Sequence, residues 1–384
     1  MIFRDGLWLP LALLMCLPLL AQEAPDITNL VDTGNAAYLK GDYEGARQAY
    51  LQAWDALQQT PPENPQRYDV LKRLTSVRAA AGEFADANNY LQMAINWREQ
   101  VNGPADPKIA ADLLQSVGLF RSMGNFDQAL VVLNRVVVLH SRGPNGFECT
   151  DVADDFSRMA QIYLQKKSMD TAVDYLTRAL EMRTKLAGPL DPSLVYDLDR
   201  LGGVYTTQRD YPNAEAAYRH ALVIRESLYG KNDADLIATV DGLAYACFGQ
   251  KKYDEAEVLY QRLLDLWSAS VGKDHPMVAL ALDKVAVFYA TQKKFDQAKA
   301  AADQANAIRA KFLAEGLSEQ ATEQFSEGNK DETMALYKRA IRALDPPDPQ
   351  YDELRTELQG MLKTVASLTP KMLVKKTPAP ARKK

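Results

Sequence analysis

The chain has 384 residues, of which 47% are apolar and 25% charged, with 20 Gly and 19 Pro; this excludes a collagen-like or low-complexity protein. The formal net charge is −5, but residues 370–384 hold six basic residues and no acid, so residues 1–369 carry −11. An acidic body argues against nucleic-acid binding over the main surface. Three Cys and three His leave little material for a disulfide framework or a metal site.

Residues 1–21 predict a secretory signal peptide. An uncharged apolar run of 14 residues, Leu7–Leu20, follows a basic residue, and Ala21 supplies a small residue before the cleavage point. The run is shorter than the about 20 residues of a membrane-spanning helix, and Pro10 and Pro18 interrupt it. We therefore expect an exported protein, periplasmic or secreted, with an uncleaved membrane anchor as the alternative.

One pattern recurs along most of the chain. A turn residue is followed two positions later by an aromatic, three further on by an alanine (the anchor), and then by apolar residues four and seven beyond. Apolar spacing of 3, 4 and 7 on both sides of the turn predicts two amphipathic helices per unit. No β-strand pattern occurs, so the expected fold is all-α. The anchors are Ala46, Ala87, Ala129, Ala172, Ala214, Ala256, Ala298 and Thr333.

Segments such as Gly272-Lys273-Asp274-His275-Pro276 connect successive units. Together with the anchors, they resemble the tetratricopeptide-repeat family, in particular the kinesin-light-chain type with units of 42 residues. The resemblance implies a right-handed superhelical solenoid of about eight helix-turn-helix units over residues 28–346. Gly is expected to end each long helix and Pro to start the next one. Gly or Asn is expected to take the left-handed conformation at the turn within each unit.

The C-terminal region differs from the repeats. Apolar residues on one helical face predict a capping helix within residues 347–368. Residues 369–384 are basic and Pro-rich, and we expect a disordered tail. Three interpretations of the tail stay open, namely a solubilising terminus, a weak contact with an anionic lipid or polymer, and a self-ligand that folds back on acidic residues.

The first helices of such a solenoid line its concave groove, so residues fifteen, eleven and eight before each anchor form one candidate stripe. Carboxylates recur every 42 residues along this stripe, and in one unit they lie beside two aromatic residues, Tyr245 and Phe248. They either contact an extended basic or amide-rich peptide, or they stabilise helix N-termini and pair with Lys or Arg of neighbouring units. The candidate binding residues are Ser157, Asp199, Gly203, Thr206, Asp241, Tyr245, Phe248, Asp283 and Val287.

No phosphate-binding loop, zinc motif or nucleophile motif occurs in the sequence. We therefore predict no enzyme activity, no cofactor and no metal, and two unpaired thiols at Cys149 and Cys247. The predicted function is a scaffold that binds a protein or an extended peptide in its groove, without nucleic acid. The alternative is an envelope-associated structural or assembly factor that uses its convex face or basic tail. No sequence feature specifies an oligomeric state.

Overall fold

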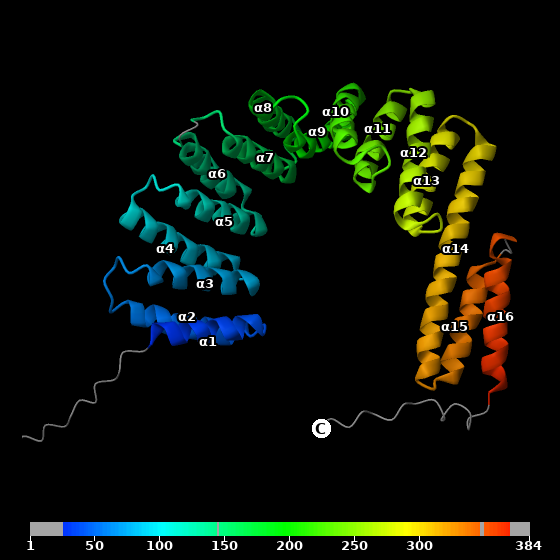
Figure 1. The fold of residues 1–384 in the computed structure, drawn as a ribbon, viewed down its shortest axis with the longest axis horizontal. Coiled ribbons are helices and arrows are strands. Elements are labelled where there is room, and N and C mark those ends of the chain that lie inside the picture. The colour runs from blue at the N-terminus through cyan, green and yellow to red at the C-terminus, as the bar shows by residue number, and fades with distance from the viewer. Residues whose placement is uncertain (1–25, 144–145, 346–348, 369–384) are drawn as a thin grey trace, which may run out of the picture. The chain divides into compact units, whose positions relative to one another are not determined.

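The computed structural model describes residues 26–143, 146–345 and 349–368. The predicted signal peptide and basic tail lie outside these residues. The chain divides after Asp155 into two compact units, here called unit 1 and unit 2. The described residues form sixteen α-helices and three short 3-10 helices, with no strand among them. The helices pack in sequential pairs (Figure 1), which confirms the expected all-α repeat fold.

Unit 1 contains repeats 1 to 3 and the start of repeat 4. Its helices are α1 (Ile27–Leu39), α2 (Tyr43–Leu57), α3 (Gln66–Ala80), α4 (Phe84–Asn102), α5 (Lys108–Ser122), α6 (Phe126–Ser141) and the beginning of α7 (Thr150–Gln165). Each repeat contributes a first helix and a second helix that carries the anchor.

Unit 2 continues the same plan. Its helices are the rest of α7, α8 (Met169–Ala187), α9 (Val195–Gln208), α10 (Tyr211–Tyr229), α11 (Ile237–Gly249), α12 (Tyr253–Val271), α13 (Pro276–Thr291), α14 (Phe295–Ser326), α15 (Lys330–Ala343) and α16 (Asp352–Ser367). The 3-10 helices are Pro192–Leu194, Ala234–Leu236 and Pro349–Tyr351. None of the described helices combines the length and the apolarity that crossing a bilayer requires.

Small residues bring the two helices of a repeat into close contact. Seven of the eight anchors are fully buried. In repeat 5, a Cβ atom added to Gly202 of α9 would lie 2.7 Å from the ring of Tyr218 on α10. In repeat 1, a Cβ on Gly34 would lie 2.3 Å from the ring of Tyr50. The large ring therefore fills the space that the missing side chain leaves.

The turn within each repeat takes the left-handed conformation in two chemically different ways. Repeats 1, 2, 3 and 8 place a glycine there, as the sequence led us to expect. Repeats 4 to 7 instead place a Lys or an Arg in this conformation, at φ between 60° and 63°, which costs an L-residue about 1–2 kcal/mol. These residues are Lys167, Arg209, Lys251 and Lys293.

The connectors between repeats follow the expected Gly and Pro rule. Gly188, Gly230 and Gly272 end α8, α10 and α12 with positive φ. Pro276 is the first residue of α13, and the ring of His275 accepts a hydrogen bond from the backbone N–H of Met277 at 3.2 Å. The connector thus closes one helix and caps the next one within a few residues.

Repeat 8 departs from the sequence pattern, because α14 serves both as the second helix of repeat 7 and as the first helix of repeat 8. Residues 306–327 contain Gly316 but no proline, so no signal ends the helix between the two repeats. α15 packs on the C-terminal half of α14, and α16 packs on α15 (Figure 1). The N-terminal half therefore has no following first helix, which leaves Phe295 66% exposed and the anchor Ala298 only half-buried.

Candidate functional site

The candidate stripe in unit 2 lies on the first helices of successive repeats, which we call the first-helix face (α9, α11 and α13). Hydrogen bonds connect these helices directly. The hydroxyl of Thr239 on α11 donates to Asp199 on α9 at 3.0 Å, and the ammonium of Lys284 on α13 donates to Asp241 on α11 at 2.5 Å. The stripe predicted from the sequence is therefore continuous across three repeats.

Each of the three predicted carboxylates is paired with a cation. Arg225 Nη1 lies 2.5 Å from Asp199, Lys284 pairs with Asp241, and Arg309 pairs with Asp283. The exposed fraction of the carboxylate side chains rises along the row from 25% to 33% to 42%. Lys284–Asp241 joins two repeats, whereas Arg225–Asp199 and Arg309–Asp283 each join the two helices of one repeat, and all three carboxylates stay partly exposed.

Two of the uncharged candidates are exposed. Tyr245 on α11 is 45% exposed and Val287 on α13 is 60% exposed. Phe248 is partly buried against the core, where its ring contacts Tyr245 at 6.3 Å and Phe288 at 5.6 Å between centroids. The accessible apolar surface of the stripe therefore belongs mainly to repeats 6 and 7.

The remaining candidates lie deeper. Gly203 is half-buried on α9. The hydroxyl of Thr206 donates to the backbone carbonyl of Gly202 at 2.8 Å. Ser157 is only 5% exposed, and its hydroxyl donates to Asp197 at 2.7 Å. At Ser157 the stripe is thus part of the packing between repeats 4 and 5.

Sequence reasoning missed a recurring pair that lies beside the stripe, which we call the joint pair. A basic residue eleven positions after one anchor contacts an Asp seventeen positions before the next anchor. The Asp side chains are at most 3% exposed, although a carboxylate is costly to bury without a partner. The joint pairs are Arg98–Asp112 at 3.6 Å, His140–Asp155 at 2.7 Å and Arg183–Asp197 at 3.1 Å. A basic residue and an Asp that recur every 42 or 43 residues could have revealed them.

The joint between repeats 4 and 5 shows how fully the side chains of a joint pair are buried and hydrogen-bonded. The guanidinium of Arg183 donates to Asp197 through Nε and to the hydroxyl of Ser157 through Nη2 at 3.1 Å. Burial raises the pKa of Asp197 above its usual range, and the Ser157 hydrogen bond and the Arg183 charge oppose this rise. All three residues of this network are buried.

One cluster in the described residues has the composition of a metal site. The ligand atoms of Glu215, Cys247 and Glu255 lie within 4.8 Å of one another. However, Arg219 and Lys252 already pair with Glu215, and burial raises the pKa of the Cys247 thiol to about 11. Because metals bind the thiolate, this cluster is better described as an ion-pair network.

The two cysteines that the structure describes are free and buried. Cys149 lies in the loop before α7, and Cys247 lies in α11. The expectation of two unpaired thiols is thus confirmed for Cys149 and Cys247.

Comparison with known proteins identifies the class. Residues 156–227 and 236–311 match the family model described as tetratricopeptide repeat; these segments cover repeats 4 to 7. Repeats 4 to 7 of this chain are therefore tetratricopeptide repeats, as the sequence pattern indicated. The matching family is an interaction scaffold, and no catalytic family matches. No curated protein matches the sequence.

Solved structures support the same fold. BtubC (BKLC) from P. vanneervenii has a TM-score of 0.50 at 18% identity, over 59% of this chain and 89% of that chain. The C-terminal part of a TPR repeat-containing protein from Cytophaga hutchinsonii has a TM-score of 0.52 at 14% identity, over 74% of this chain and 95% of that chain. At these identities the likeness shows the fold alone.

Proposed function

We propose that this protein is a non-enzymatic, exported scaffold that binds a protein or an extended peptide on the first-helix face of its repeats. Tetratricopeptide repeats mediate protein–protein interaction, and repeats 4 to 7 match that family. We choose this face because Tyr245 and Val287 are exposed there beside a row of partly exposed ion pairs.

The chemistry of this face fits an extended chain. Neighbouring helices pack at about 8–10 Å, so the ion pairs recur at intervals of that order along the face. Each pair offers both an acceptor and a donor to peptide amides, while Tyr245 and Val287 offer apolar contact. A basic side chain of the partner would also compete with Lys284 or Arg309 for the paired carboxylate.

Two exposed valines provide a matched test of the face. Val287 lies on the first-helix face and is 60% exposed, whereas Val258 lies on the second helix α12 and is 69% exposed. Affinity capture with the full chain, from cells that produce it, should lose its partners with Val287→Glu and keep them with Val258→Glu. The opposite pattern would favour the alternative, in which the other face makes the main contact.

The pattern of residues 1–21 supports export. Sequencing the N-terminus of the protein isolated from cells should show a start near Gln22. A retained Met1 in a membrane fraction would instead favour the uncleaved anchor.

A further inference from the structure

The joint between repeats 6 and 7 lacks the joint pair. Trp267 of α12 stands where repeats 2, 4 and 5 have an Arg, and Ala281 of α13 stands where repeats 3 to 5 have an Asp. An indole and a methyl group thus replace a guanidinium and a carboxylate at an otherwise equivalent place. The change converts the polar contact of this joint into an apolar one.

A hollow of about 560 Å³ opens at this joint, between α11 and α13, with α12 as its floor. This volume lies within the about 300–1,000 Å³ of typical ligand sites. Leu280 is 49% exposed at the hollow, so part of the apolar lining is open to a ligand. Besides two alanines of the connector and of α11, the apolar lining consists of Ile237, Leu263, Trp267, Met277, Leu280 and Ala281.

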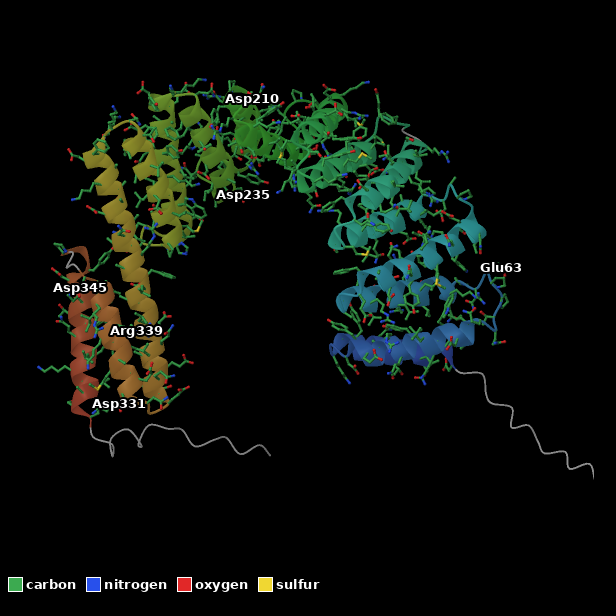
Figure 2. All side chains as sticks on the ribbon, turned by 180° about the vertical axis from the view of Figure 1, so that it is seen from behind. Glu63, Asp210, Asp235, Asp331, Arg339 and Asp345 are labelled. Carbon is green, nitrogen blue, oxygen red and sulfur yellow. The ribbon has the colours of Figure 1, made fainter. Side chains whose placement is uncertain are left out.

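The polar rim of the hollow carries more negative than positive charge. Asp235, Asp241 and Lys284 line it, and Lys284 is already paired with Asp241. Asp235 is exposed in the connector between α10 and α11, near the end of α10 that lies opposite Asp210 (Figure 2). Among the described residues, its carboxylate has no ion-pair partner. The rim therefore favours a basic neighbour and disfavours an acidic one.

We infer that the hollow at Trp267 is an anchor pocket for an extended peptide that carries a bulky apolar side chain next to a Lys or an Arg. The apolar side chain enters between α11 and α13 and covers Trp267 and Leu280. The neighbouring basic side chain lies against Asp235. A buried apolar anchor with charges at the rim is the usual arrangement of an energetic hot spot. The inference rests on the proposed function and names the partner chemistry of one place on that face.

The test uses three fluorescent peptides in a Gly-Ser host, with the central sequences Lys-Phe-Lys, Glu-Phe-Glu and Lys-Ser-Lys, titrated with the full chain by fluorescence anisotropy. We expect Lys-Phe-Lys to bind at least about tenfold more tightly than the other two. Asp235→Asn should weaken Lys-Phe-Lys by about threefold at low salt and by less at high salt. Equal binding of all three peptides would overturn the inference.

Two variants localise the binding. Leu280→Glu should weaken Lys-Phe-Lys by about tenfold or more, whereas Leu228→Glu, at a leucine that is 46% exposed on α10, should have no effect. The double variant Trp267→Arg and Ala281→Asp rebuilds the joint pair, so it should stay folded while losing the peptide. Unchanged binding in Leu280→Glu would contradict the pocket even if the double variant failed to fold.

Further outcomes separate this inference from the proposed function. If cellular partners are lost with Val287→Glu but kept with Leu280→Glu, the pocket is wrong and the function stands. If deletion of residues 369–384 tightens Lys-Phe-Lys binding about tenfold, the chain's own tail occupies the pocket, and the inferred partner is wrong.

Discussion

The joint between repeats 4 and 5 and the joint between repeats 6 and 7 are built from equivalent helices. The first is polar and closed, and the second is apolar and open. In the first, Arg183 and Asp197 form a buried pair that Ser157 completes. In the second, Trp267 and Ala281 take the same two places, and a hollow opens beside them. The repeat period thus fixes how the helices pack, while two side chains at each of these joints decide whether it is closed or accessible.

The largest expected effect is on the closed joint. Asp197→Ala leaves Arg183 buried without its carboxylate and should lower the free energy of unfolding of unit 2 by about 3–5 kcal/mol. Asp199→Ala, only two residues away, removes a partly exposed pair and should cost about 0–1 kcal/mol. Urea unfolding of the full chain, followed by circular dichroism, measures both. Similar losses for the two variants would show that burial does not distinguish them.

Two adjacent glycines on α9 should respond with opposite signs. Gly202→Ala places a Cβ 2.7 Å from the Tyr218 ring, so overpacking should cost about 1–3 kcal/mol. At Gly203 the nearest atom to an added Cβ is the Tyr218 hydroxyl at 3.8 Å. Gly203→Ala should therefore stabilise the helix by about 0.5–1 kcal/mol. Thermal unfolding of both variants measures the difference, and a stabilising Gly202→Ala would refute close helix approach.

The left-handed turns separate repeats 1 to 3 from repeats 4 to 7. Lys251→Gly should stabilise the chain by about 1 kcal/mol, because glycine has no Cβ penalty at φ 63°. The reciprocal change Gly124→Lys, in repeat 3, should destabilise the chain by a similar amount. No atom lies within 4 Å of an added Cβ there, so the positive φ of 71° is the only cost. If both changes are neutral in thermal unfolding, the left-handed turn carries no strain.

The smallest expected effect is a pH dependence at the connector between repeats 4 and 5. Hydrogen bonds from Ser193 lower the pKa of Asp191. The stability contributed by its charge is therefore present above the usual Asp pKa of about 3.9 and is lost as pH falls through the lower folded value. In Asp191→Asn, the unfolding temperature should fall less steeply on acidification. An identical slope in both proteins would argue against this cap.

Asp197 in the same joint works in the opposite direction. Because burial raises its pKa in the folded state, the folded protein holds this proton more tightly than the unfolded chain. Stability from Asp197 therefore decreases as pH rises from its ordinary pKa to its raised folded value. Because Asp191 and Asp197 act with opposite signs, the pH dependence of the unfolding temperature in the unmodified chain combines both. The difference between Asp191→Asn and the unmodified chain isolates the contribution of Asp191.

The sequence predicted the fold where the signal is local and periodic. The anchors and the Gly and Pro residues of the connectors each depend on neighbours in the same hairpin or connector, so spacing alone reveals them. The continuous α14 was missed because a weak eighth repeat suggested two helices, although residues 306–327 contain no proline to separate them. Lys251 in a left-handed turn was missed because its side chain carries no such preference.

The candidate site was predicted less completely, because its chemistry depends on partners from other helices. The register placed Asp199, Asp241 and Asp283 on one face, as the structure has them. Pairing with neighbouring repeats was one of the two alternatives, but Arg225 and Arg309 come from the second helices of the same repeats. The burial of Ser157 likewise depends on Arg183 and on a carboxylate of the next repeat.

Photocrosslinking tests the central claim most directly. Tyr245 on the first-helix face is 45% exposed, and Tyr229 at the end of α10 is 52% exposed, so the two positions are matched in residue type and accessibility. A photoreactive p-benzoylphenylalanine at each position, irradiated in producing cells, should yield partner adducts at position 245 and none at position 229. Adducts at position 229 alone, or equal adducts at both, would contradict recognition by the first-helix face.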